Sequence, residues 1–310
     1  QAPGNNKSFC RGQRMDNKGG QRMATESTLS TEVSMGKKSL RILSLGAGVQ
    51  SSTLALKIKH GEIPMVDAAI FADTKGEPKA VYTWLDWLEK QLNYPVYRVV
   101  WRDLRQDIFD ASVGKYKAFT APFYTKNPET GKKGFLRRQC TADYKIKPVV
   151  QKVREMLGLK WGEKRKKGTS VEMIMGISID EIFRMKTNRL KYITNVYPLI
   201  DEKLSREDCK KWMKEKGYPT PPRSACTFCP YHSTEEWLKI KQNKEEWAEV
   251  VAMDKAIRNT EKFKDGAKAT KVNDELFLHR SCVPIDQVDF GKEDPQLDLF
   301  NSECEGMCGN

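Results

Sequence analysis

From residue 40 onward, short apolar runs alternate with longer segments of helical periodicity. The apolar runs that predict buried strands lie at 40–45, 66–72, 96–101 and 171–177. The segments that predict helices lie at 51–60, 77–92, 103–111 and 143–158. This alternation is typical of a parallel sheet with crossover helices, so we predict an α/β fold with a Rossmann-like, doubly wound parallel sheet. Ligands of such sheets bind at the carboxyl ends of the strands.

After residue 200 the pattern changes, and we predict helices without further strands. Ser205 and Asp208 have the spacing of a capping box, and Gly217 is a suitable helix stop. Residues 233–258 predict one helix with Trp237, Trp247 and Val250 on its apolar face. We therefore predict a first domain over 35–200 and a mostly helical, cysteine-containing subdomain over 201–310.

Residues 1–34 have almost no apolar periodicity and are rich in Gly, Asn, Ser and Thr. We expect this segment to be disordered or to be upstream, non-native sequence. In the second case the native start is Met35 or Met23.

Composition and charge narrow the class of protein. A mean hydropathy of −0.65 and 31% charged residues argue against a membrane protein. The net charge of +13 should attract a polyanion, either nucleic acid or a multiply phosphorylated small molecule. Eight cysteines are too few for a disulfide scaffold and no secretory signal precedes them, so we expect a cytoplasmic, reducing environment in which cysteines bind metal or do redox chemistry.

Residues Ser44–Ser52 join the first predicted strand to the first predicted helix. Gly46 and Gly48 allow the backbone to approach a ligand closely. Free N–H groups at the helix start, helped by the hydroxyls of Ser51 and Ser52, suit an anionic phosphate. An ordinary strand-to-helix turn also favours glycine and an N-cap serine, so the residues alone leave both interpretations open.

This stretch resembles the PP-loop of the adenine nucleotide α-hydrolase superfamily. Gly48–Ser52 is particularly similar to the variant found in the phosphoadenosine phosphosulfate reductase family, which often has Gln at the position of Gln50. The ATP-pyrophosphatase members usually carry Asp there. Gly46 departs from the pattern, because a Ser is usual at its position.

Three further segments extend the resemblance in the expected order. Asp73–Pro78 resembles the family's Asp-Thr-Gly segment, and Tyr197–Leu199 resembles the Pro-Leu turn before a helical C-terminal portion. In Gly176–Glu181, Ser178 replaces a family arginine, and Arg184 is the nearby residue that would compensate. The resemblance implies nucleotide contacts from Ser44, Gly46, Gly48, Gln50, Ser51, Ser52, Asp73, Thr74, Gly176 and Asp180.

The cysteines form a second candidate site. Cys226 and Cys229 have the Cys-x-x-Cys spacing that grips one metal centre, and a distant cysteine such as Cys140 commonly completes it. The alternative is three buried structural cysteines. Pro230 and the expected reducing compartment favour a metal or a cluster.

The cysteine pattern also resembles the iron–sulfur subset of sulfonucleotide reductases. Cys140, Lys145 and Pro148 match that subset, whereas Thr141 stands where a second adjacent cysteine is expected. The resemblance implies a 4Fe–4S cluster on Cys140, Cys226 and Cys229, with Cys282 as the first candidate for a fourth ligand. Behind Cys282 come Cys304, Cys308 and Cys209.

Two other metal arrangements stay open. Three cysteines with one open iron site resemble the centres of related PP-loop sulfur-transfer enzymes. Zinc is the other alternative, because His232 follows Cys229 by three residues and would complete a Cys₃His site.

The chain ends in a cysteine-containing tail, Glu303–Gly309. In the reductases a C-terminal Glu-Cys-Gly segment carries the nucleophilic cysteine, so the resemblance implies Cys304, Lys145 and Asp73 as catalytic residues. Lys145 would neutralise charge near the cluster and the sulfate. A solvated end, or a tail that folds back onto the cluster, is the alternative. Glu303 and Glu305 would raise the pKa of a thiol between them.

Residues 113–139 form a basic loop with interleaved aromatic side chains. From 112 to 139 there are seven Lys and Arg against the single acid Glu129, together with Tyr116, Phe119, Phe123, Tyr124 and Phe135. Such a loop binds DNA or RNA by charge and stacking, or it is a solvated insertion whose rings pack onto the domain.

These features predict a phosphoadenosine phosphosulfate reductase-like enzyme acting at the α-phosphate or attached sulfate of APS or PAPS, with a thioredoxin-like reductant. The alternative is an ATP- and Mg²⁺-dependent PP-loop enzyme that modifies DNA or RNA. A third interpretation is a catalytically inactive protein that senses nucleotides or binds nucleic acid.

Overall fold

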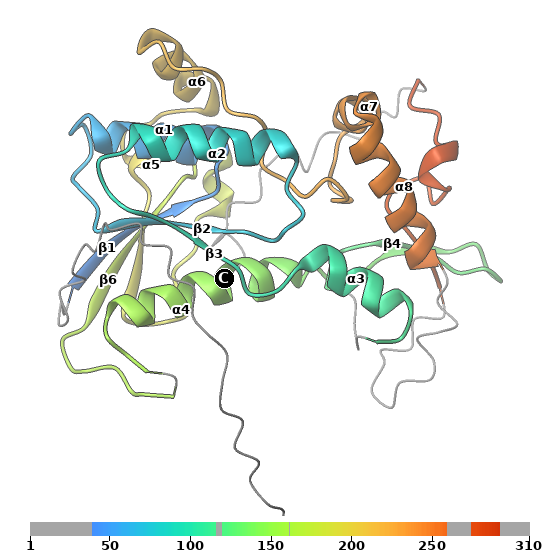
Figure 1. The fold of residues 1–310 in the computed structure, drawn as a ribbon, viewed down its shortest axis with the longest axis horizontal. Helices are drawn as coiled ribbons and strands as arrows, with labels where there is room; N and C mark the ends of the chain where they lie inside the picture. Colours follow the sequence, from blue (N-terminus) through green and yellow to red (C-terminus); the bar gives the residue numbers. More distant parts are fainter. Residues whose placement is uncertain (1–38, 116–119, 161, 259–273, 292–310) are drawn as a thin grey trace, which may run out of the picture. The chain divides into compact units, whose positions relative to one another are not determined.

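Five parallel strands form the central sheet of the molecule, in the order β3-β2-β1-β6-β7 (Figure 1). The computed structural model describes residues 39–115, 120–160, 162–258 and 274–291. The strands of this sheet are β1 (Ser39–Leu45), β2 (Ala68–Ala72), β3 (Val96–Val99), β6 (Ser170–Met175) and β7 (Ile193–Val196). The sheet order confirms the predicted α/β, Rossmann-like fold. The predicted segment 1–34 lies outside the described residues.

Helices cover both faces of the sheet because each strand alternates its apolar side chains between two cores. Leu43 and Leu45 of β1 face one core, and Leu40 and Ile42 face the other. The first core includes residues of α1 (Val49–Lys59), α2 (Lys79–Gln91) and α6 (Arg206–Glu215). The second core includes residues of α4 (Lys147–Met156). The sheet is therefore doubly wound, as predicted.

A third core lies beside a small antiparallel sheet of order β5-β4-β8. Its strands are β4 (Tyr124–Lys126), β5 (Lys133–Phe135) and β8 (Glu275–Phe277), and its helices are α3 (Leu104–Ser112), α7 (Thr234–Gln242) and α8 (Lys244–Arg258). The prediction that strands stop after residue 200 is wrong, because β8 pairs with β4. A strand of three residues is too short to produce a recognisable period.

The helices after residue 200 agree with the prediction in one place and differ in another. The capping box of Ser205 and Asp208 begins α6, and Gly217 follows its end with φ +73°. The single helix predicted over 233–258 is wrong. Asn243 leaves helical geometry, and its side-chain oxygen accepts hydrogen bonds from the N–H groups that begin α8. Within the described residues, no helix has the length and apolarity to cross a lipid bilayer.

Short helices connect the remaining elements. They are η1 (Thr141–Ile146), a π-helical turn, η2 (Ile179–Arg184), α5 (Pro198–Asp201) and η4 (Ile285–Gln287). The described residues, all of which follow Met35, form one compact unit. Cys209 and Met213 of α6 lie in the same core as α1, so elements on both sides of residue 200 share a core.

A buried ammonium group fastens the end of α1. The Lys57 Nζ atom lies 2.9 Å from a Glu62 carboxylate oxygen and 3.0 Å from a Glu202 oxygen, and 8% of the Lys57 side chain is exposed. Burial alone would raise the pKa of Glu62, but hydrogen bonds and charge from Lys57 outweigh it and hold that pKa below 4.5. The stabilisation from this carboxylate is therefore present above pH 4.5 and is lost as the pH falls through the lowered pKa.

Lys57→Met is expected to lower the free energy of unfolding by about 2 kcal/mol at neutral pH, because it removes charged hydrogen bonds. The difference from wild type should shrink as the pH falls below 4.5, which urea denaturation at several pH values measures. Lys59→Met on the same helix is the control, since Lys59 lies over the ring of Tyr218. An equal loss of stability for both variants at every pH would contradict the assignment of this stabilisation to the ion pairs of Lys57.

Candidate functional site

The chain reverses its winding direction between β1 and β6. From β1 it proceeds outward to β2 and β3, and it later returns to the other side of β1 with β6 and β7. The loops that follow β1 and β6 therefore open next to each other at the carboxyl edge of the sheet. This switch point is where open α/β sheets bind ligands.

The loop after β1 has the geometry of an anion site. The Gly46 N–H donates to the Ser51 hydroxyl oxygen at 3.1 Å, and Ala47 takes a left-handed conformation with φ +60°. Gly48 is the extended N-cap of α1 and supplies no side-chain cap. The first N–H groups of a helix have no intrahelical acceptor, and together with the helix dipole they favour a phosphate.

The two serine hydroxyls predicted to hold phosphate already have protein partners. Ser51 accepts the Gly46 N–H, and the Ser52 hydroxyl accepts the Trp84 indole N–H at 3.0 Å. Both side chains are buried. They shape the loop by accepting these bonds, and each hydroxyl can still donate its own proton to a ligand beside the backbone N–H groups. Ser44 is buried in β1 just before this loop.

Gly176, directly after β6, packs against the first turn of α1. A Cβ atom on Gly176 would lie 2.8 Å from the Ser51 nitrogen and 2.9 Å from the Ser51 Cα. Atoms that close to backbone force a shift of the backbone itself. The absence of a side chain at Gly176 thus allows the two loops of the switch point to meet.

Gln50 joins these loops through a buried polar chain. Its Nε2 donates to the Ser178 hydroxyl at 3.3 Å, and its Oε1 accepts from Arg206 Nη1 at 3.3 Å. Arg184, predicted to compensate for the arginine that Ser178 replaces, forms an ion pair with Glu181. Arg206, at the start of α6, is therefore the arginine that reaches the loop. The capping box of Ser205 and Asp208 predicted where α6 begins. No local pattern in the sequence indicated that Arg206 would contact Gln50.

Asp180 has a supporting position. Its Oδ1 accepts the backbone N–H of Arg206 at 3.1 Å, and its side chain is exposed. This contact fastens the start of α6 near the switch point.

The residues that follow β2 form the next part of this edge. Asp73 is buried and accepts from the Tyr82 hydroxyl at 2.8 Å and from the Lys75 N–H at 2.7 Å, and the Lys75 Nζ lies 2.8 Å from its other oxygen. Burial first, and then the Asp73 carboxylate, raise the pKa of Tyr82 above its usual range. Lys75 has φ +62°, which makes the sharp turn. Asp73 thus organises the turn, with its carboxylate engaged by its neighbours.

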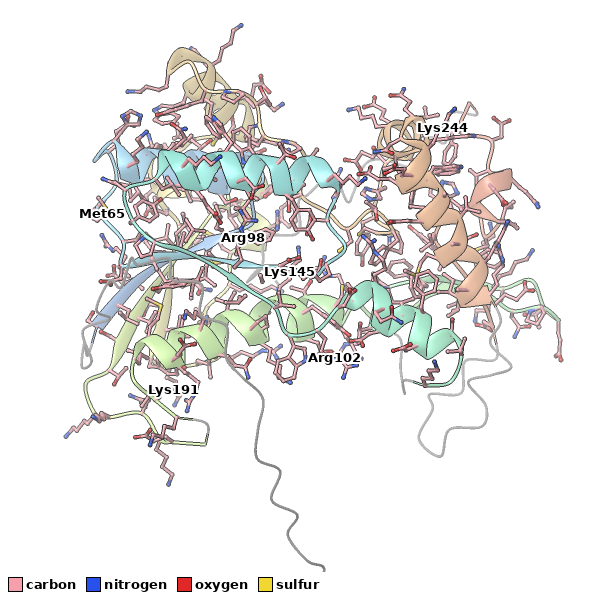
Figure 2. All side chains as sticks on the ribbon, in the orientation of Figure 1. Met65, Arg98, Arg102, Lys145, Lys191 and Lys244 are labelled. Carbon is pink, nitrogen blue, oxygen red and sulfur yellow. The ribbon has the colours of Figure 1, made fainter. Side chains whose placement is uncertain are left out.

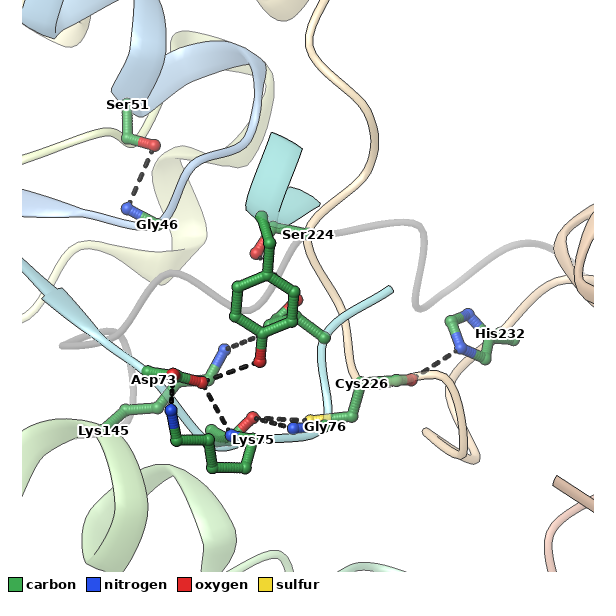
Figure 3. A network of polar contacts seen from close by, with 12 residues as sticks. Gly46, Ser51, Asp73, Lys75, Gly76, Lys145, Ser224, Cys226 and His232 are labelled. Carbon is green, nitrogen blue, oxygen red and sulfur yellow. Dashed lines mark hydrogen bonds and ion pairs between the residues drawn. The ribbon is translucent and has the colours of Figure 1, made fainter. Parts of the chain in front are cut away.

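The same turn contacts the Cys-x-x-Cys segment, as Figure 3 shows. The Thr74 hydroxyl lies 3.2 Å from the Cys226 sulfur, and the Thr227 N–H donates to the Gly76 carbonyl oxygen at 2.8 Å. A Cβ on Gly76 would lie 2.8 Å from the Phe228 ring and 3.2 Å from the Cys226 sulfur. The carboxyl end of β2 is therefore in direct contact with the cysteine loop.

Three predicted metal ligands meet in one pocket, which we call the thiol pocket. It is lined by Thr74, Leu104, Pro122, Arg138, Cys140, Lys145, Arg223, Ala225, Cys226, Cys229 and Tyr231. Three of these side chains are cysteines and three are cations. The pocket thus combines soft sulfur donors with positive charge.

Lys145 is held by a buried acid. Its Nζ lies 3.4 Å from a Glu77 oxygen, with 8% of the Lys145 side chain and none of the Glu77 side chain exposed. The Ser224 hydroxyl donates to the other Glu77 oxygen at 3.1 Å. Lys145 lies inside the molecule, unlike Lys191 and Lys244 at its periphery (Figure 2). Its position on the π-helical turn η1 directs a cation at the thiols, and π-helical turns are frequent at functional sites.

Burial and nearby charges set the pKa values of Cys226 and of His232, which contacts its backbone. Burial raises the pKa of Cys226 well above its usual value, and the charge of Glu77 adds to that effect while Lys145 opposes it. His232 donates from Nε2 to the Cys226 carbonyl oxygen at 2.9 Å. Burial, with the charge of Arg223, lowers the pKa of His232 to about 4, so this histidine is neutral at pH 7.

The thiol pocket offers only sulfur donors, a set that suits zinc as well as an iron–sulfur cluster. Its lining contains no Asp, Glu or His, so every described metal-ligating side chain is a cysteine. His232, the candidate fourth zinc ligand, faces the Cys226 carbonyl instead. Among the described residues, no three Cys, His, Asp or Glu side chains are placed to hold one metal ion.

The other predicted cysteines lie apart from this lining. Cys282 is buried, with its sulfur 3.7 Å from the carbonyl oxygens of Thr125 and Arg280, and burial raises its pKa. Cys209 lies in the core beneath α1. Cys304 and Cys308 lie outside the described residues, so the structure gives no position for the predicted nucleophile.

Comparison with known proteins adds little to this geometry. No protein-family model matches the chain, and no curated protein matches it. Among solved structures, the chain is similar to phosphoadenylyl-sulfate (PAPS) reductase from Candida auris in a phosphate complex, with 10% sequence identity and a TM-score of 0.35. That alignment covers 61% of this chain and 78% of the other. Side-chain roles do not transfer across so low an identity, and the contacts described above carry the proposals that follow.

Proposed function

We propose that this protein is an enzyme that binds an adenine nucleotide at the β1–α1 loop and breaks a bond at the nucleotide's α-phosphate or at a sulfate attached to it. The first N–H groups of α1 would hold phosphate oxygens. The thiol pocket would receive the reacting group. Its cations are Arg138, Lys145 and Arg223, of which Lys145 is ion-paired with Glu77 and Arg223 with Glu236. Such cations would bind the oxygens of a phosphate or sulfate.

One observation carries this proposal: the contact between Thr74 and Cys226 at 3.2 Å. Thr74 follows β2, the strand next to β1 in the sheet, and Cys226 belongs to the thiol pocket. The anion site and the thiols therefore lie on neighbouring strands of one sheet edge. An extended nucleotide that began at α1 would direct its phosphates or sulfate toward the thiols.

The thiol pocket would hold an iron–sulfur cluster through Cys140, Cys226 and Cys229. The soft donors of its lining are three cysteines, which are the usual ligands of iron–sulfur clusters. When bound, such a cluster would supply iron that can act as a Lewis acid toward the reacting group. Lys145 is held by Glu77, and it would place its positive charge beside the reacting group.

In the first version of the reaction the substrate is an adenylyl sulfate. A thiolate attacks the sulfate sulfur, an S–S bond forms, and the bond between sulfur and the phosphate oxygen breaks. The nucleoside phosphate leaves with the electron pair. A second thiol then forms a disulfide with the first and releases sulfite, and a dithiol protein of the thioredoxin class reduces that disulfide.

In the second version the substrate is ATP with Mg²⁺. An oxygen of a second substrate attacks the α-phosphorus, the bond from that phosphorus to the bridging oxygen breaks, and pyrophosphate leaves. The carbon that bears the adenylylated oxygen is then open to a sulfur or nitrogen nucleophile, and AMP leaves with that oxygen and its electron pair. The exposed cations of the 113–139 loop favour this version, because a small sulfonucleotide does not need them.

Anaerobic assays of the full chain test the proposal. We expect micromolar binding of an adenine nucleotide by calorimetry, together with one of two products. Sulfite from APS or PAPS with a dithiol reductant supports the first version, and pyrophosphate from ATP and a nucleic-acid acceptor supports the second. Nucleotide binding without either product would overturn the enzymatic proposal in favour of a nucleotide sensor. Absence of nucleotide binding would overturn the proposal as a whole.

A further inference from the structure

Three aromatic rings form a row at the rim of the thiol pocket. Tyr124 of β4 and Phe135 of β5 are directly opposite in the antiparallel pair, with ring centroids 4.7 Å apart. The Phe135 ring lies 5.5 Å from the ring of Tyr231, which lines the thiol pocket. This aromatic row therefore extends from the small sheet to the candidate reaction site.

The middle ring of the aromatic row is open to solvent. Phe135 is 41% exposed, and every residue of β5, an edge strand, is exposed. Folding therefore buries this large apolar ring only in part. A flat ligand that covered it would remove apolar surface from water and gain stacking contacts.

Cations flank the aromatic row. Lys132, Lys133, Arg137 and Arg138 are exposed. The Arg138 guanidinium lies 5.7 Å above the centre of the Tyr231 ring, and the Lys133 Nζ donates to the Ser281 carbonyl oxygen at 2.9 Å. These exposed positive charges lie close to Phe135 in the chain and suit the phosphates of a nucleic-acid strand.

We propose that this surface binds single-stranded nucleic acid, with a base stacked on the aromatic row and phosphates on the flanking cations. Stacking platforms beside a basic groove are the usual means of holding a single strand, whereas the bases of a duplex are already stacked on each other. Tyr231 belongs to both the row and the pocket, so a bound strand would present a nucleotide to the thiols. This inference rests on the proposed function and names the second substrate of its ATP-dependent version.

Fluorescence anisotropy with labelled oligonucleotides of about 20 nucleotides tests the proposal. We expect single-stranded DNA or RNA to bind more tightly than a duplex of the same sequence. Phe135→Ala should weaken that binding at least about fivefold, and Phe135→Tyr should restore it. Phe183→Ala is the matched control, because Phe183 is 74% exposed on η2, and it should leave binding unchanged.

The contribution of the cations to oligonucleotide binding is measured separately, through the salt dependence of the affinity. Between about 50 and 200 mM salt, the triple variant Lys132→Gln, Lys133→Gln, Arg137→Gln should reduce the slope of log affinity against log salt by about 2. The same change at Lys210, Lys211 and Lys214 of α6 should leave the slope unchanged. Preference for duplex, equal effects of Phe135→Ala and Phe183→Ala, or equal slopes for the two triple variants would each overturn the inference.

Failure of this inference differs from failure of the proposed function. If the aromatic row binds a strand, Phe135→Ala lowers oligonucleotide affinity but leaves ATP affinity intact. If ATP binds and no oligonucleotide does, the inference fails and the nucleotide proposal stands. If oligonucleotides bind and no adenine nucleotide does, the nucleotide proposal fails and the surface assignment stands.

Discussion

Gly176→Ala is expected to weaken adenine-nucleotide binding about tenfold or more and to lower the free energy of unfolding by about 1–3 kcal/mol. The added methyl would lie 2.8 Å from the Ser51 nitrogen and 2.9 Å from its Cα. Relief of that contact requires a shift of the first turn of α1. Such a shift moves the N–H groups away from the phosphate oxygens, and hydrogen bonds weaken as they lengthen. Calorimetry with ATP and urea denaturation measure the two effects.

Gly291→Ala is the matched control for this variant. The methyl there would lie 3.3 Å from an Asp289 carboxylate oxygen, which is a side-chain atom on the surface and can move. We expect nucleotide affinity and stability close to those of wild type. If Gly176→Ala kept wild-type ATP affinity while Gly291→Ala lost it, the proposal that the start of α1 binds phosphate would be wrong.

Cys226→Ala is expected to remove most of the iron and acid-labile sulfide from anaerobically purified protein. For the wild type we expect about four of each per chain, the content of one 4Fe–4S cluster. Cys226 lines the thiol pocket beside Cys140 and Cys229, so its loss leaves two described thiols there. Metal and sulfide analysis together with the visible spectrum measures the result.

Cys209→Ala removes another buried thiol and is the control. Cys209 lies in the core beneath α1, and burial raises its pKa to about 12. Its replacement should lower stability without loss of iron. Cys282→Ala, assayed in the same way, reports whether Cys282 supplies the fourth ligand. One zinc and no iron in the wild type, or equal iron loss in the Cys226 and Cys209 variants, would contradict the cluster.

The proposed site depends on a small number of close contacts between distant segments. Gly176 meets Ser51 at the switch point, and Gly76 meets Cys226 and Phe228 at the next strand. Both glycines lie where backbone or sulfur occupies the space of a side chain. These contacts hold the anion site and the thiol pocket at one edge of the sheet.

The parts of the site that lie within one short segment were predictable from sequence. The loop from Gly46 to Ser52 combines a strand, two glycines and a helix start in consecutive residues, so its geometry follows from local preferences. Cys226 and Cys229 are likewise neighbours in the chain. The capping box of Ser205 is local for the same reason, and the structure has it as expected.

The parts that join distant segments were not predictable in this way. Arg206 reaches Gln50 across 156 positions, and Glu77 meets Lys145 across 68. The small sheet was missed because its strands have three residues each, too few for a period. The cysteines of the sequence suggested Cys140 as a partner of the Cys-x-x-Cys pair, but only the folded chain brings its thiol to the same pocket.

By itself, the sequence determined the class of the fold and the location of the glycine-containing loop between β1 and α1, because hydrophobic periodicity and local turn chemistry are properties of neighbouring residues. The tertiary structure decided which cations face the thiols, which arginine reaches the loop after β1, and that Tyr124, Phe135 and Tyr231 form one row. Those pairings depend on how the sheet winds and how the helices pack on it, and such contacts are recorded in no short stretch of the chain.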